Sequence, residues 1–215
     1  MKRKLTQRGR ERRAQLMERA AGLFADQGYH PTSVSDVVES LGVGKGVFYW
    51  YFESKEDLFK EILSSAQHDL RRRQQAAIGD EPDPLRRIEL GMRASMAWFA
   101  ENRHLFNLFG FAATEERFRP VLRQNEEVAV ADVVKHLKDA MAEGHIPDGD
   151  PAVLAHALIG AGRHLARTYL YEANEPCEAV ADAAVSFTLY GVSGRLPSPA
   201  GRPGVPGAAR VGEPG

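Results

Sequence analysis

The sequence has few of the features that mark several large classes of protein. Its 215 residues include one cysteine, Cys177, so no internal disulfide can form and no cysteine-based zinc site exists. No apolar run reaches the roughly 18 residues that a membrane helix needs, and no apolar signal core follows the basic N-terminus. With 43% hydrophobic and 27% charged residues, the chain is expected to be a globular protein of the reducing cytoplasm.

Strand patterns are nearly absent, and almost every segment has helical spacing of its apolar residues. Leu16, Ala20 and Phe24 share one helix face, and Gly28 is placed to end that helix. Further helices are expected at 34–41, 45–52, from 54 towards 70, and at 84–102, 105–113, 118–143, 151–173 and 176–193. The sequence therefore predicts an all-α fold.

Motifs of catalysis are also missing. The segment 191–194 reads GVSG, which is not the G-x-S-x-G of hydrolases, and no strand precedes it. The seven histidines are scattered and form no H-E-x-x-H pair, and Cys177 has no histidine near it in the sequence. We therefore expect neither an enzyme nor a metal site, and no cofactor.

Charge is unevenly placed along the chain. Residues 1–19 contain eight Lys or Arg against two Glu, whereas residues 61–195 contain 15 against 20 acidic residues. This asymmetry indicates an anionic partner at the N-terminal end, although a solvated, disordered basic tail would have the same composition.

A Gly-Lys turn and a run of aromatic residues lie side by side in the segment 42–52, GVGKGVFYWYF. A phosphate loop would need Ser or Thr after Lys45 and a strand before it, and neither is present. A short helix, a glycine turn and a second helix instead have the dimensions of a helix-turn-helix. On such a helix Phe48 and Phe52 face inward, while Tyr49 and Trp50 point out and can donate to DNA phosphates.

The segment 32–59, TSVSDVVESLGVGKGVFYWYFESKEDLF, resembles the DNA-binding domain of the TetR family of bacterial transcriptional regulators. The resemblance rests on the Thr/Ser pair before the second helix, the Gly-Val turn, the Lys-Gly step, the Tyr-x-Tyr-Phe end and the Ser-Lys start of the fourth helix. Two positions depart from the family pattern. Gly44 stands where Ser is common, and Val47 where Thr is common, so one hydroxyl contact with DNA is lost at each.

The resemblance implies roles for individual residues. Ser33 and Ser35 would approach the DNA backbone or a base, and Lys45, Gly46 and Val47 would face the groove. Tyr49, Trp50 and Lys55 would contact phosphates. Arg10 and Arg13, on the first helix, would reach a flanking phosphate or the minor groove.

Composition and the same resemblance together divide the chain into four parts. These are a basic disordered arm at 1–9, a three-helix helix-turn-helix domain at 10–53, a helical ligand-binding and dimerisation domain at 54–195, and a disordered Pro/Gly-rich tail at 196–215. Small and apolar faces on the last two helices suit a four-helix interface between two chains, or packing within one chain. The expected interface residues are Leu158, Leu165, Val180, Ala184, Phe187 and Gly191.

The middle helices are rich in bulky apolar side chains, which suits an apolar ligand. The expected apolar lining is Met96, Phe99, Phe106 and Phe109, and the expected polar contacts are Asn125, His164 and Arg167. A ligand with an anionic head would place it near Arg167. This part of the chain also loosely resembles regulators of actinobacterial lipid metabolism that sense acyl-CoA.

These features together imply a cytoplasmic, dimeric transcriptional repressor that binds a palindromic operator and is switched by a small apolar molecule, such as a fatty acyl-CoA or another lipid-like compound. The alternative is a small helical carrier of an apolar ligand that does not use DNA. The basic arm and the helix-turn-helix distinguish the two, because a carrier needs neither.

Overall fold

The computed structural model describes residues 5–193, and within them all regular structure is helical. The elements are α1 (Gln7–Gln27), α2 (Val34–Glu39), α3 (Lys45–Tyr51), α4 (Lys55–Ile78), α5 (Pro84–Glu101), α6 (Arg103–Thr114), the 3₁₀ turn η1 (Glu116–Phe118), α7 (Arg119–Ala142), α8 (Pro151–Leu165), the π-helical segment η2 (Ala166–Glu172) and α9 (Cys177–Ser193). In this part of the chain no helix is both long enough and apolar enough to cross a membrane. The all-α prediction is confirmed.

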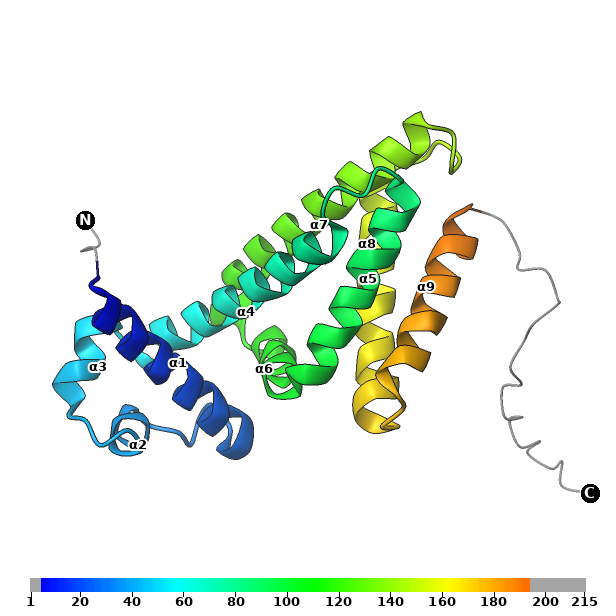
Figure 1. The fold of residues 1–215 in the computed structure, drawn as a ribbon. Helices are drawn as coiled ribbons and strands as arrows, with labels where there is room; N and C mark the ends of the chain where they lie inside the picture. Colours follow the sequence, from blue (N-terminus) through cyan, green and yellow to red (C-terminus); the bar gives the residue numbers. More distant parts are fainter. Residues whose placement is uncertain (1–4, 194–215) are drawn as a thin grey trace, which may run out of the picture.

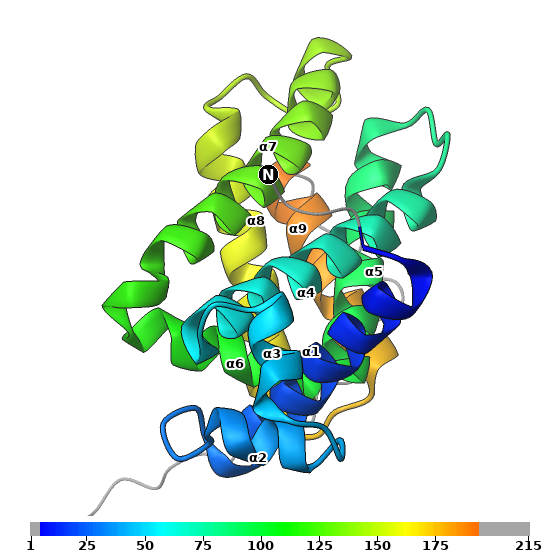
Figure 2. The same cartoon turned by 90° about the vertical axis from the view of Figure 1, so that its left-hand side faces the viewer.

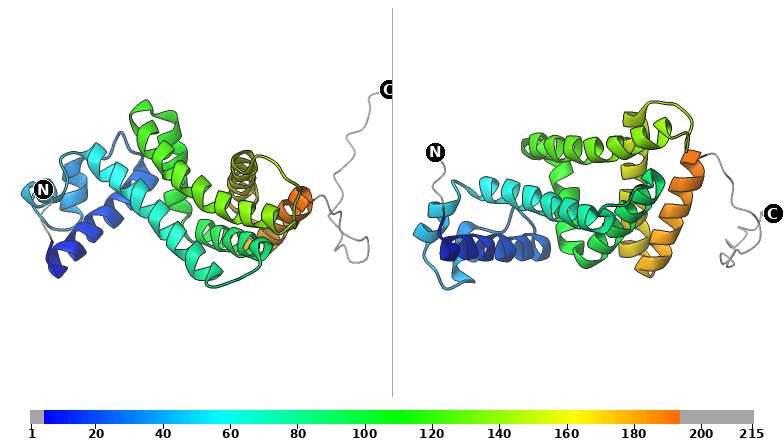
Figure 3. Two further views of the ribbon diagram at one scale, coloured as in Figure 1. Left: turned by 90° about the horizontal axis from the view of Figure 1, so that it is seen from above. Right: turned by 45° about the horizontal axis from the view of Figure 1, so that its top comes forward.

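Two bodies are joined by one long helix. Helices α1, α2 and α3 form a small head at one end of the molecule, and α5 to α9 form the larger core at the other (Figure 1). Helix α4 begins in the head and runs into the core, where it packs against α5 and α7. Helix α1 of the head also packs against α6 of the core, and Figure 3 shows the head at one end of the molecule.

Local signals in the sequence set the boundaries of the head helices. Ser33 caps α2 in a reciprocal capping box, because its hydroxyl accepts from the Asp36 backbone N–H and its own N–H donates to the Asp36 carboxylate. Ser54 caps α4 by accepting from the Asp57 backbone N–H at 3.0 Å. Gly28 and Gly42, after α1 and α2, have φ values of 92° and 63°, which favour glycine.

The first of three buried clusters holds the head together and joins it to the core. Phe48 of α3 and Phe52, which caps the end of α3, pack there with Phe24 of α1, Phe59 of α4 and Phe118 of η1. Five aromatic rings at the contact between the two bodies are in contact with one another, and we call them the junction cluster: Phe24, Tyr29, Phe59, Phe111 and Phe118. The other two clusters lie within the core.

Some predicted boundaries were wrong. Helix α1 begins at Gln7, so residues 7–9 of the expected arm are helical, because Thr6 accepts a hydrogen bond from the Gly9 backbone N–H and caps the helix. Helix α4 continues to Ile78 rather than ending near Leu70. The 3₁₀ turn and the π-helical segment were not expected. The tail at 196–215 and residues 1–4 lie outside the described residues.

Candidate nucleic-acid interface and ligand cavity

Helix α3 divides its aromatic side chains between the head interior and the surface, as predicted. Phe48 and Phe52 are fully buried, whereas Tyr49 and Trp50 are 58% and 65% exposed. Lys45 and Gly46 are also exposed at the start of the helix, and Val47 is half-buried against the head core. Helices α2 and α3 lie at the end of the molecule away from α8 and α9 (Figure 1), and Figure 2 shows this end facing the viewer. This end is therefore free to meet a large ligand.

The start of α3 has a low, open surface. Gly44 is the N-cap, and no side chain within residues 5–193 caps the first turn. A Cβ atom added at Gly44 or Gly46 would meet nothing within 4 Å. Packing within the protein therefore does not require glycine at either position. Their small size instead leaves the backbone N–H groups open to an approaching anion.

We expect Gly46→Ala to stabilise the protein and to weaken its binding to DNA. The new methyl group meets no protein atom and removes the helix penalty of glycine, worth up to about 1 kcal/mol. The same methyl group stands on the surface expected to face the groove, so affinity should fall roughly tenfold. Thermal unfolding and fluorescence anisotropy of a labelled duplex measure the two effects.

Gly22→Ala in α1 is the matched control, since a Cβ atom there also meets nothing within 4 Å. It should raise stability without changing DNA affinity. Equal DNA affinity in Gly46→Ala and the unmodified protein would place the contact surface elsewhere.

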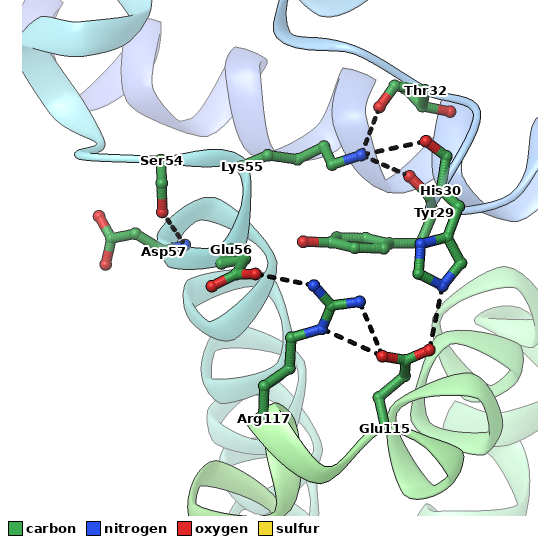
Figure 4. A network of polar contacts seen from close by, with 9 residues as sticks. All are labelled: Tyr29, His30, Thr32, Ser54, Lys55, Glu56, Asp57, Glu115 and Arg117. Carbon is green, nitrogen blue, oxygen red and sulfur yellow. Dashed lines mark hydrogen bonds and ion pairs between the residues drawn. The ribbon is translucent and has the colours of Figure 1, made fainter.

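Lys55 does not fit its expected role as a phosphate contact. Its ammonium donates to the backbone carbonyls of Tyr29 at 2.8 Å, His30 at 3.3 Å and Thr32 at 2.8 Å, and lies 4.4 Å from the centre of the Tyr29 ring (Figure 4). Burial, and then the charge of Arg117, lowers its pKa from the ordinary value. Because an ammonium has three N–H groups, all of them are used within the protein. Lys55 therefore fixes the α1–α2 loop to the start of α4.

The two arginines of α1 also have partners within the protein. Arg13 forms an ion pair with Glu61 of α4 at 2.7 Å and lies over the Phe52 ring, so it joins α1 to α4 rather than reaching DNA. Arg10 donates to the Leu5 carbonyl and the Gln7 side chain, which folds it back onto its own helix end. Ser33 is exposed, but its oxygen is the α2 cap, and Ser35 beside it is half-buried.

The predicted dimer residues divide between two faces of α8 and α9. Leu158, Val180 and Ala184 are buried inside the core, and Leu165 packs against it, so these four residues hold the chain itself together. Phe187 is 62% exposed, and Gly191 is also exposed. Four of the six predicted interface residues therefore face the interior of the chain, and Phe187 and Gly191 face outward. The outward faces carry Val153, Ala157 and Gly160 on α8, and Ala179, Ala183, Phe187, Tyr190 and Gly191 on α9.

A cavity of about 290 Å³ lies in the core between α4, α5, α7 and α8. Only Met96 and Phe99 of the seven predicted ligand residues line it. Phe106 packs between the rings of Phe99 and Tyr171, and Phe109 is half-buried beside two clusters. Asn125 donates to the Leu63 carbonyl of α4 at 3.4 Å. His164 is exposed, and Arg167 lines a separate pocket with Phe106 and Tyr171, so the predicted position of an anionic head at Arg167 lies outside this cavity.

The residues that line the cavity but were not predicted lie mainly on α4 and α7. They include Gln67, Arg71 and Gln74 of α4, Arg87 of α5, Asp132 and His136 of α7, and Arg163 of α8. One signal was available in the sequence: Gln67 and Gln74 interrupt the apolar face of α4, and Gln67 is buried. A polar side chain on a buried face needs a partner or a ligand, which marks such positions.

A network of charges joins the head to the core at the start of α4. Arg117 of η1 pairs with Glu56 of α4 at 2.8 Å and with Glu115 at 2.7 Å, and Glu115 in turn contacts His30 of the α1–α2 loop at 3.0 Å (Figure 4). Tyr29 lies at the centre of this network, where burial and then the Glu56 charge raise its pKa to about 12. The phenol therefore stays neutral, and the network connects three segments far apart in the sequence.

Comparisons with known proteins agree with this geometry. Residues 16–62 match the model of "Bacterial regulatory proteins, tetR family". Over 190 residues the chain is 23% identical to the uncharacterized HTH-type transcriptional regulator YdgC of Bacillus subtilis, covering 86% of this chain and 94% of that protein. The structure resembles a TetR-family regulator from Syntrophomonas wolfei with a TM-score of 0.78 and 23% identity. The similar region covers 87% of this chain and 97% of that one. It also resembles the transcriptional regulator FadR of Bacillus subtilis in complex with stearoyl-CoA, with a TM-score of 0.76 and 17% identity. The similar region covers 83% of this chain and 98% of that one. These similar proteins are named as regulators of transcription, not as enzymes.

Proposed function

Because this chain belongs to the TetR family of bacterial transcriptional regulators, we propose that it is a repressor that binds a palindromic operator as a homodimer and leaves it when a small effector enters the core cavity. The observation that carries the proposal is the division of α3, with two phenylalanines buried and Lys45, Gly46, Tyr49 and Trp50 on one open end of the molecule. A helix of this kind fits the major groove.

The outward face of α8 and α9 supports the dimer. The two helices lie side by side, and exposed Val153, Phe187 and Tyr190 stand there beside the small residues Ala157, Gly160 and Ala183. Exposed apolar groups next to small residues allow two helix pairs to approach closely and bury that surface. Two copies joined in this way carry two α3 helices related by two-fold symmetry, and an inverted repeat has the same symmetry.

Helix α4 supports the link between effector and DNA. Its first turns hold the head through Lys55, and its last turns, from Gln67 onward, line the cavity. A ligand that favours one position of α4 therefore changes the spacing of the two heads. It shifts DNA affinity only to the extent that it binds the two positions with different affinity, and about 1.4 kcal/mol of difference gives a tenfold change.

We expect Arg117→Gln to reduce the response to effector without abolishing DNA binding. Arg117 lies in η1 and joins Glu56 of α4 to Glu115, so its loss should loosen the head without changing a side chain of α3. The ratio of DNA affinities with and without effector should fall from tenfold or more to about twofold. Anisotropy titrations of an operator duplex at a fixed effector concentration give this ratio.

Arg93→Gln is the matched control, because Arg93 pairs with Glu89 and Asp182 entirely within the core. The control should keep the full ratio. A full ratio in Arg117→Gln as well would remove the charge network from the switch.

The effector we propose is apolar with an anionic group, and fatty acyl compounds are one candidate class. A structural neighbour with 17% identity was solved with stearoyl-CoA, which makes this class worth testing here. The cavity of about 290 Å³ is smaller than such a molecule, so a shorter acid is the better first choice.

Binding of the protein to DNA from its own promoter region tests the proposal. The expected result is a shift of a fragment that holds an inverted repeat, with affinity that falls steeply as salt rises, and release on addition of effector. Retention of an apolar ligand without affinity for any DNA would support a carrier instead.

A further inference from the structure

The cavity of the core has two kinds of wall. One is apolar and is formed by Leu70, Met92, Met96, Phe99 and Leu158. The other is polar and positively charged, with Arg71, Arg87, Lys135 and Arg163 against the single carboxylate of Asp132. The volume of about 290 Å³ equals roughly ten water-sized volumes, which suits a molecule of roughly ten non-hydrogen atoms.

The carboxylates near the cavity already have partners. Asp132 accepts two hydrogen bonds from Arg71, at 2.5 and 2.9 Å, and Asp139 accepts one from Arg87 at 2.9 Å. Arg163 is different, because the nearest carboxylate, Glu126, lies 3.7 Å away and makes no hydrogen bond with it in the described part of the chain. Among the three arginines that line the cavity, Arg163 is thus the one whose charge is least compensated.

Arg163 also lines the cavity, and the surrounding protein partly withdraws its guanidinium from bulk water. Its side chain is 42% accessible, yet desolvation by the surrounding protein lowers its pKa, and the Glu126 charge only partly opposes this. The adjacent Gly162 packs directly on α5, since a Cβ atom there would lie 3.2 Å from the Met92 sulfur. The charge of Arg163 therefore stands next to the apolar wall.

Two further nitrogen atoms of the cavity-lining residues have no hydrogen-bond partner in the part of the chain that the structure describes. Arg87 Nε and His136 Nδ1 are buried, and neither has a hydrogen-bond partner among the residues that the structure describes. An arginine can only donate, so what the site lacks there is an acceptor. Unmet buried donors are costly, and a ligand that supplies oxygen atoms after a small side-chain rotation removes that cost.

We propose, on the basis of the function proposed above, that the cavity binds a small amphipathic acid whose carboxylate pairs with Arg163 and whose apolar body lies against Met92, Met96 and Phe99. A neutral or cationic molecule of the same shape leaves the guanidinium without an acceptor. The site therefore selects an anion of medium chain length over the corresponding alcohol or amine.

Titration calorimetry of the full-length protein with octanoate, octanol and octylamine tests the proposal. Octanoate should bind at least tenfold more tightly than the other two. In Arg163→Gln this preference should disappear, through a tenfold to hundredfold loss for octanoate and little change for octanol. Arg93→Gln, which removes a cation outside the cavity, should bind all three as the unmodified protein does.

Gly162→Ala tests the position of the site. Because Gly162 is buried, the added methyl group crowds Met92 and Met96, which line the cavity, so octanoate and octanol should weaken together. Thermal stability should fall modestly, as it does when a core is overpacked. Octanol binding as tightly as octanoate, or an unchanged preference in Arg163→Gln, overturns the proposal.

DNA binding measured on the same samples separates the two claims. A protein that prefers octanoate through Arg163 but binds no DNA refutes the proposed function and leaves the ligand class standing. A protein that binds its operator but takes octanol as well as octanoate does the reverse.

Discussion

Replacing Phe187 with Glu is expected to turn a dimer into a monomer and to weaken operator binding roughly a hundredfold. Phe187 is 62% exposed in the described chain and stands next to Tyr190 on the outward face of α9. In the proposed interface its ring becomes buried, and a glutamate there would bury an unpaired charge. A monomer binds only one half-site at a time and loses the gain in affinity that comes from binding two linked half-sites.

Sedimentation velocity gives the oligomeric state, and anisotropy gives the affinity. Val128→Glu is the matched control, because Val128 is an exposed apolar residue on α7, away from α8 and α9 in the sequence. The control should remain a dimer. If Phe187→Glu also remains a dimer with unchanged affinity, the interface lies on another face.

Replacing Phe59 with Ala is expected to lower the free energy of unfolding by about 3–5 kcal/mol. Phe59 is fully buried, and its ring lies 4.6 Å from Phe118, 4.9 Å from Tyr29, 5.6 Å from Phe24 and 5.8 Å from Phe111, measured between ring centres. Its loss leaves a cavity between head and core. The head should then unfold before the core.

Urea unfolding followed by two probes, helical circular dichroism and the fluorescence of Trp50 in the head and Trp98 in the core, measures this. Phe59→Leu keeps most of the buried volume and should lose less than half as much stability. A single cooperative transition at the original urea concentration in Phe59→Ala would show that the junction cluster does not hold the two bodies together.

The head could be predicted from the sequence because short-range signals decide it. Two serines, Ser33 and Ser54, cap the starts of α2 and α4. Two glycines with positive φ, Gly28 and Gly42, follow the ends of α1 and α2, so each signal concerns the helix beside it in the sequence. The inward direction of Phe48 and Phe52 followed from their spacing alone.

The faces of α8 and α9 could not be predicted in the same way. Both helices carry small or apolar residues nearly all round, so helical periodicity does not select the buried side. The result was that Leu158 and Val180 were expected outside and lie inside. Arg163 of α8 lines the cavity, whereas Arg167 lies beyond the end of α8 in the π-helical segment η2 and lines the separate pocket beside α6.

The partners of Lys55 and Arg13 were also beyond the sequence. Both residues have the charge that DNA contact requires, and only the fold brings the carbonyls of residues 29–32 and the Glu61 carboxylate to them. A positive charge near a recognition helix is therefore weak evidence of DNA contact until its neighbours are known.

Hydroxyl-radical footprinting of the full-length protein on its selected operator shows whether a symmetric dimer binds two half-sites. We predict protection of two half-sites in an inverted repeat, arranged symmetrically about one centre, with the recognition helices in successive major grooves about 34–36 Å apart or at a larger regular separation. Lys45→Glu should remove both protected regions together. Protection of a single half-site by a monomer, or an unchanged pattern with Lys45→Glu, would contradict it.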